Sequence, residues 1–151
     1  MSRKKTFDLT SATALIKRFE GLSLTAYQCS AGVWTIGYGH TGGVHQGDVI
    51  TQEQADALLE QDISTRATGL TSILDKAGAK VTEPQFNALL SLGYNIGLTA
   101  LSSSTLMSHL AAGRTEQAAG EFSRWIYSGG KILPGLVTRR AEERALFEGT
   151  A

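Results

Sequence analysis

A glutamate, a cysteine and a threonine lie near the N-terminus, in a segment rich in aromatic residues and glycines. Glu20 ends a stretch of helical periodicity, Cys29 follows nine residues later, and Thr35 follows six residues after that. Hydrolysis of a glycosidic bond needs a proton donor on one side of the bond and an activated water on the other. A helix end beside a hairpin can hold such groups across a cleft, so the spacing indicates a glycosidase site.

Glu20 is the candidate proton donor. A carboxylate at the C-terminus of a helix lies near the negative end of the helix macrodipole, which disfavours its ionised form. Partial burial acts in the same direction, and a general acid must keep its proton until the reaction. The competing interpretation is an ordinary surface glutamate, which the residue alone does not exclude.

Thr35 and Cys29 are the candidates for the water side of the reaction. The Thr35 hydroxyl could hold the attacking water, although threonine is also common in strands. Cys29 lies beside a Ser-Ala-Gly turn sequence, which argues against deep burial. Its thiol could hold the same water or attack carbon as a thiolate. An unperturbed thiol has a pKa of about 8.5, so little thiolate exists at neutral pH.

Composition restricts the class of protein. With 151 residues, 42% of them apolar, we expect a single domain over residues 1–151. Fourteen basic and fourteen acidic residues balance, which argues against nucleic-acid binding. No run of about 18 apolar residues exists, so membrane insertion is not expected. The histidines and the single cysteine lack metal-ligand spacing, and we expect neither a metal nor a cofactor.

Periodicity predicts the elements that position these residues. We expect a helix over residues 10–20, a small antiparallel sheet of two or three strands in a lobe over about 22–50, and a long connecting helix from a capping box at 51–54 to about Ala77. Gly69 is a point where this helix could break. The rest reads as a helical lobe over about 80–148, with helices that start near residue 82 and then span about 104–112, 115–125 and 138–147. Two such lobes would leave a cleft between them.

Several ordered motifs extend the signal over residues 15–147. Ile-Gly-Tyr-Gly-His-Thr follows the Glu20, Cys29 and Thr35 spacing at 36–41. Further motifs lie at 85–97, 104–106, 118–125 and 135–147. In this combination and order, the chain resembles the phage lysozyme (endolysin) family of muramidases.

The resemblance implies an α+β, lysozyme-like fold and hydrolysis of the β-1,4 bond between N-acetylmuramic acid and N-acetylglucosamine in peptidoglycan. Glu20 would be the general acid, and Thr35 would position the water. Cys29 would stand where many members carry aspartate. Because a neutral thiol cannot replace a carboxylate electrostatically, two routes remain: inversion by a water held at Thr35 and Cys29, which we favour, or thiolate attack with retention.

Other residues receive supporting roles from the resemblance. Arg139, in preference to Arg140, would hold the Glu20 carboxyl group. His40 would pair with the Asp62 carboxylate in a structural role. Substrate-binding positions are implied for Thr41, Tyr94 and Thr105.

The resemblance also implies a role in lysis of a Gram-negative host by a phage or prophage. We expect a monomer that accumulates in the host cytoplasm, escapes through a membrane pore made by another protein, and then reaches the periplasm and cell wall. Two other functions stay open. One is a lytic transglycosylase, against which Thr35 counts, because that chemistry needs no water activator. The other is a non-catalytic peptidoglycan-binding or virion domain.

Overall fold

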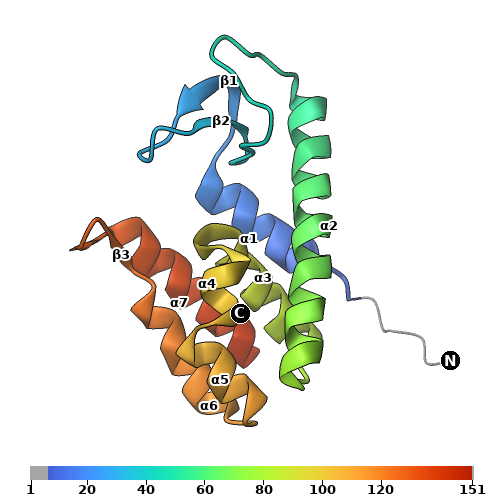
Figure 1. The fold of residues 1–151 in the computed structure, drawn as a ribbon, viewed down its shortest axis with the longest axis vertical. Coiled ribbons are helices and arrows are strands. Elements are labelled where there is room, and N and C mark those ends of the chain that lie inside the picture. The colour runs from blue at the N-terminus through green and yellow to red at the C-terminus, as the bar shows by residue number, and fades with distance from the viewer. Residues whose placement is uncertain (1–6, 151) are drawn as a thin grey trace, which may run out of the picture.

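The computed structural model describes residues 7–150, which form a small sheet lobe and a helical lobe joined by one long helix (Figure 1). The elements in chain order are α1 (Thr10–Glu20), β1 (Ser23–Gln28), β2 (Trp34–Gly37), α2 (Gln52–Ala77), α3 (Glu83–Ile96), α4 (Leu98–Ser102), α5 (Thr105–Ala111), α6 (Thr115–Glu121), η1 (Phe122–Arg124), β3 (Tyr127–Ser128), β4 (Lys131–Ile132) and α7 (Pro134–Glu148). The expected α+β architecture is confirmed.

The sheet lobe contains one antiparallel pair of strands. β1 pairs with β2, and Tyr27 lies opposite Thr35. The register shifts between Ser23 and Tyr27, which is a local irregularity of the strand. An isolated bridge between Thr25 and Val49 brings the following loop against β1 without forming a third strand.

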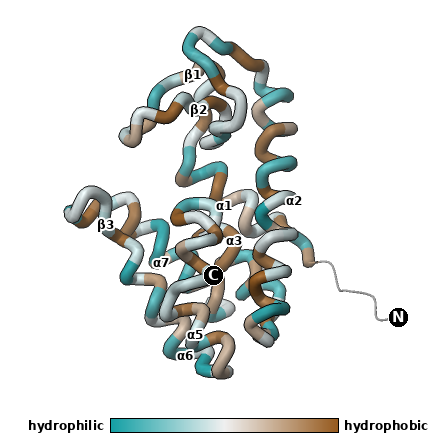
Figure 2. Tube along the Cα trace, in the orientation of Figure 1, coloured by the Kyte–Doolittle hydropathy of each residue, from teal (hydrophilic) through white to brown (hydrophobic). Residues whose placement is uncertain are grey.

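The connecting helix α2 is unbroken over 26 residues. At its start, Thr51 accepts a hydrogen bond from the Gln54 amide, and the Gln54 side chain accepts one from the Thr51 amide. The expected break at Gly69 is absent because this glycine serves helix packing: a Cβ there would lie 2.6 Å from Leu98 Cδ1 of α4. Hydrophilic and hydrophobic residues alternate along α2 (Figure 2), and none of the described helices is long and apolar enough to cross a membrane.

Helix α3 forms the centre of the helical lobe. Every residue from Phe86 to Tyr94 is buried, and α3 packs against α1, α2, α4 and α7. The buried amide of Asn87 fixes α1 on this helix: its Oδ1 accepts from the Ala12 amide at 2.9 Å, and its Nδ2 donates to the Asp8 carbonyl at 2.8 Å. Helix α1 therefore belongs structurally to the helical lobe.

The C-terminal part departs from the sequence expectations. A hairpin of β3 and β4 interrupts the expected helical run, with Gly129 and Gly130 at positive φ in a two-residue turn. Strands of two residues have no periodicity to detect. Helix α7 begins at Pro134, four residues earlier than expected, because proline is favoured in the first turn of a helix.

Candidate active site

The carboxyl group of Glu20 lies where α1 ends against α7. Glu20 is the last residue of α1, and Gly21 ends the helix with a φ of 72°. Glu20 Oε2 accepts a hydrogen bond from Arg139 Nη1 at 2.7 Å, and the glutamate side chain is 20% exposed. A Cβ on Gly39 would lie 2.9 Å from Glu20 Oε1. The carboxyl group is thus held between a buried arginine and the backbone that follows β2.

Arg139 is itself fixed by α3 and α7. Its guanidinium is almost fully buried and donates from Nη2 to the Ser91 carbonyl at 3.1 Å and from Nε to Glu143 Oε2 at 3.2 Å. The Ser91 hydroxyl donates to the same Glu143 oxygen at 2.6 Å. Each donor group of Arg139 therefore has a defined acceptor, and the hydrogen bond to Glu20 has a fixed direction.

Arg140 points to a different set of partners. It donates from Nε to the Trp125 carbonyl at 2.8 Å, from Nη1 to Glu143 and from Nη2 to Asn95. Burial lowers the pKa of Arg140, and the Glu143 carboxylate opposes this shift. Of the two arginines, Arg139 contacts Glu20.

Cys29 and Thr35 lie near the turn of the β1–β2 hairpin. The Cys29 amide donates to the Val33 carbonyl at 2.9 Å, and the Thr35 hydroxyl donates to the same carbonyl at 3.0 Å. Cys29 is half-buried, in agreement with the sequence expectation, and Thr35 is buried. Hydrogen bonds from the backbone of Val33 and Ala31, with a smaller one from Thr35, lower the pKa of the Cys29 thiol.

The lowered pKa changes what Cys29 can do. It raises the thiolate fraction at neutral pH above that of an ordinary cysteine. A thiolate next to a threonine hydroxyl can accept a proton from a bound water or attack carbon directly.

His40 and Asp62 form the expected pair. His40 Nδ1 lies 2.7 Å from Asp62 Oδ2, and Nε2 lies 2.9 Å from the Gly42 carbonyl. The contact joins the loop after β2 to α2, so this pair fixes the sheet lobe on the connecting helix.

Tyr94 provides a second contact between the lobes. Its hydroxyl donates to the Tyr38 carbonyl at 2.9 Å, and the Arg66 guanidinium lies 4.5 Å from the centre of its ring. Burial, reinforced by the negative charge of Asp62, raises the pKa of Tyr94, so the residue stays a neutral hydrogen-bond donor. The backbone of Tyr38 and Gly39 is thereby held over Glu20.

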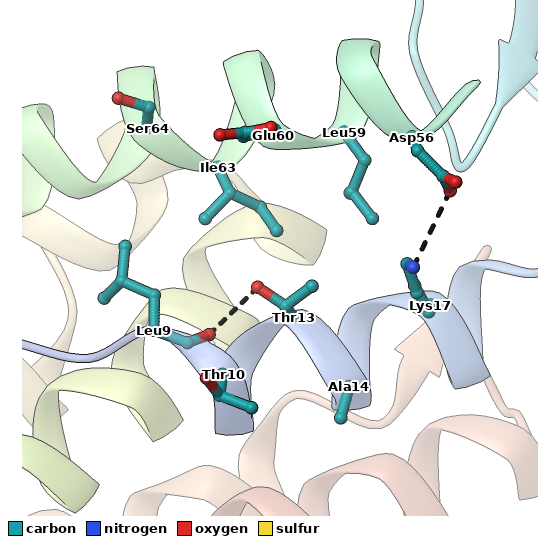
Figure 3. A pocket seen from close by; sticks show the side chains of 10 residues that line it. All are labelled: Leu9, Thr10, Thr13, Ala14, Lys17, Asp56, Leu59, Glu60, Ile63 and Ser64. Carbon is teal, nitrogen blue, oxygen red and sulfur yellow. Dashed lines mark hydrogen bonds and ion pairs between the residues drawn. The ribbon is translucent and has the colours of Figure 1, made fainter. Parts of the chain in front are cut away.

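Other expected site residues lie outside this cluster. Thr41 and Thr105 are exposed, and within residues 7–150 no hydrogen bond joins either of them to Glu20 or Arg139. A cavity of about 740 Å³ lies between α1 and α2 (Figure 3), with Leu9, Leu59 and Ile63 among its apolar lining and the Lys17–Asp56 ion pair at one end. Its lining does not include Glu20, so this cavity is distinct from the candidate site.

The sequence interpretation missed the contacts of Ser91 and Glu143. Glu143 follows Arg139 by four residues and Arg140 by three, a spacing that places opposite charges together on a helix. This spacing could have predicted the contacts of Glu143 with the two arginines, whereas nothing in the sequence connects Ser91 to this helix.

Comparison with known proteins gives a consistent result. The profile of the phage lysozyme family matches residues 17–143. An endolysin of Acyrthosiphon pisum secondary endosymbiont phage 1 is 49% identical over 140 residues, which cover 89% of this chain and 92% of that protein. An endolysin of Bacillus phage B103 is 48% identical over 136 residues, which cover 88% of this chain and 51% of that protein. This chain therefore spans about half the length of the second relative.

A solved structure agrees with this result. The muramidase domain of SpmX from Asticaccaulis excentricus superposes with a TM-score of 0.84 at 35% identity, covering 94% of this chain and 98% of that one. The fold of this chain is that of a lysozyme-like glycoside hydrolase. The chain belongs to the phage lysozyme family, and it is a peptidoglycan hydrolase of the endolysin class, which acts in lysis of the host cell.

Proposed function

We propose that this enzyme is a muramidase that hydrolyses the β-1,4 bond between N-acetylmuramic acid and N-acetylglucosamine with inversion at the anomeric carbon. The observation that carries the proposal is the Glu20 carboxyl group held by Arg139 at 2.7 Å. Cys29 is proposed to stand where many members of the family carry aspartate, and it shares the Val33 carbonyl as a hydrogen-bond acceptor with Thr35. Thr41, Tyr94 and Thr105 are proposed to contact the glycan, and the Tyr94 hydroxyl also supports the sheet lobe above the glutamate.

In the proposed reaction, protonated Glu20 donates its proton to the glycosidic oxygen as the bond to the anomeric carbon breaks. A water held by the Thr35 hydroxyl attacks that carbon from the opposite face. The Cys29 thiolate accepts the proton that this water loses. Glu20 ends as a carboxylate and Cys29 as a thiol, and exchange with solvent restores both.

In a second route, the Cys29 thiolate is the nucleophile. In it, the thiolate attacks the anomeric carbon as the glycosidic bond breaks and Glu20 protonates the leaving oxygen. Water, deprotonated by the Glu20 carboxylate, then displaces the sulfur and regenerates the thiolate, with overall retention. The two routes predict opposite anomers. Nuclear magnetic resonance of the product formed in the first seconds, before mutarotation, distinguishes them, and an increase of intact mass by one glycan fragment would establish the covalent route.

Mass spectrometry of digested peptidoglycan tests the bond specificity. We expect muropeptides with an ordinary N-acetylmuramic acid at the reducing end. Products lighter by one water would identify a lytic transglycosylase. N-acetylglucosamine at the reducing end would place the cleavage at the other glycosidic bond, and the muramidase proposal would be wrong.

Substitution of Cys29 separates its two roles. If the side chain holds or deprotonates a water, Cys29→Ser and Cys29→Asp should keep the inverted product, with Cys29→Asp the more active because a carboxylate is the better base. If the thiolate is the nucleophile, Cys29→Ser should lose about 10³-fold or more of the rate. The rate of muropeptide release measures the difference.

Alkylation provides an independent test of Cys29. The chain has one cysteine, so iodoacetamide reports on this site alone. We expect alkylation at neutral pH to be faster than that of free cysteine and to abolish hydrolysis. Alkylated protein with full activity would exclude Cys29 from the reaction.

We further propose that the enzyme acts as a monomer and reaches the wall from the host cytoplasm through a pore made by a separate membrane protein. Light scattering after size exclusion tests the first point. Expression in a host without such a pore protein tests the second: growth should continue until the inner membrane is permeabilised.

A further inference from the structure

Glu143 is a fully buried carboxylate between two buried arginines. Its Oε2 accepts hydrogen bonds from Arg139 Nε and from the Ser91 hydroxyl, and its Oε1 accepts one from Arg140 Nη1. Glu143 is 0% exposed. The two guanidinium groups share the single Glu143 carboxylate. Arg139 contacts a second carboxyl group, that of Glu20.

We propose that Glu143 is a positioning residue that keeps the proton on Glu20 by balancing the charge of Arg139. The inference rests on the proposed role of Glu20 as general acid. An arginine beside a carboxyl group favours its ionised form, which is the wrong form for a proton donor. Glu143 shares the guanidinium of Arg139 with Glu20, so its negative charge offsets part of the positive charge that Arg139 presents to Glu20.

The geometry explains why both carboxyl groups can use one guanidinium. Arg139 presents Nη1 to Glu20 at 2.7 Å and Nε to Glu143 at 3.2 Å, while Nη2 is occupied by the Ser91 carbonyl. The Ser91 hydroxyl holds the Glu143 oxygen that faces Arg139. Glu143 is therefore held in direct contact with Arg139 as well as with Arg140.

Other charged groups around the cluster have partners of their own. From α2, Asp62 and Arg66 act on Tyr94, whose hydroxyl also senses the charges of Glu20 and Arg139. Asp62 pairs with His40 after β2. On the exposed side, Arg18 of α1 pairs with Glu142 of α7. The substitutions at Glu143 and Arg140 leave these groups unchanged, so the groups give a constant background to both.

The test uses two charge-removing substitutions with opposite expected signs. Glu143→Gln removes the balancing anion, so Glu20 should lose its proton more readily and the alkaline limb of the pH–activity profile should move about one unit lower. Hydrolysis at a pH above that limb falls about tenfold. Arg140→Gln removes a cation that also acts on Glu20, so the alkaline limb should move to higher pH.

Opposite shifts distinguish charge balance from loosened packing, which lowers kcat without moving the limb. Glu143→Asp keeps the charge and should keep the limb at its wild-type pH even if kcat falls. Glu142→Gln removes a charge from a half-buried neighbour on the same helix that pairs with Arg18 rather than with Arg139, and it should leave the profile unchanged. If Glu143→Gln yields no folded protein, Arg140→Gln and Glu143→Asp decide the matter.

Limbs that stay fixed, or that move in the same direction in both glutamine variants, would overturn the inference. The outcome is separate from that for the general acid. If Glu20→Gln is inactive and the alkaline limb of Glu143→Gln lies at the wild-type pH, only the present inference fails. If Glu20→Gln is active, the proposed function fails first.

Discussion

Glu20→Gln is expected to lower the rate of peptidoglycan hydrolysis by about 10²–10⁴-fold, the usual contribution of a positioned general acid. Glutamine has nearly the same shape, and its amide oxygen can still accept the hydrogen bond from Arg139 Nη1. It has no proton to give to the leaving oxygen. The thermal unfolding midpoint should therefore change little while muropeptide release nearly stops.

Glu60→Gln is the matched control for this prediction. Glu60 is exposed on α2 and lines the cavity of Figure 3, away from the Glu20 cluster. Hydrolysis by this variant should equal that of the wild type. A large loss in Glu60→Gln together with a mild one in Glu20→Gln would place the reaction at that cavity. Wild-type activity in Glu20→Gln would exclude Glu20 as the acid.

Gly39→Ala is expected to reduce hydrolysis by about 100-fold through displacement of the proton donor. The added Cβ would lie 2.9 Å from Glu20 Oε1, so the carboxyl group must move. A shift of about 1 Å in a catalytic group can cost about 100-fold in rate. Alanine is also strained at the positive φ of 85°, which should lower the free energy of unfolding by about 1–2 kcal/mol.

Gly43→Ala separates these two effects. Gly43 lies in the same loop with a φ of 69°, and nothing lies within 4 Å of its added Cβ. Both variants should lose similar stability in urea titrations, but only Gly39→Ala should lose activity. Equal activity of the two folded variants would mean that the approach of Gly39 to Glu20 has no role in the reaction.

Local chemistry made much of this fold predictable. The capping box of Thr51 and Gln54 marks the start of α2, and Gly21 marks the end of α1, because both features depend on neighbours in the sequence. Glu20, Cys29 and Thr35 could be proposed from their spacing for the same reason.

The rest depends on contacts that no local pattern contains. In the sequence, Gly69 is a possible helix breaker. The structure shows that Leu98 packs against it, a contact between distant residues. The β3–β4 hairpin is too short for periodicity to reveal. The environment of Arg139 combines residues from α1, α3 and α7, and its contact with Glu20 spans 119 positions in the chain. Sequence resemblance gave Arg139 its role, but it gave no account of Ser91 or Glu143.

The docking of α1 on α3 and α7 has a consequence for synthesis of the chain. Helix α1 leaves the ribosome before α3 and α7, and its contacts through Asn87 and Arg139 are with residues 75 and 119 positions later. The proton donor therefore lacks its arginine partner until α7 has been made. A nascent or truncated chain that stops before α7 contains the glutamate and the β1–β2 hairpin but not Arg139, so we expect lytic activity only once α7 is present.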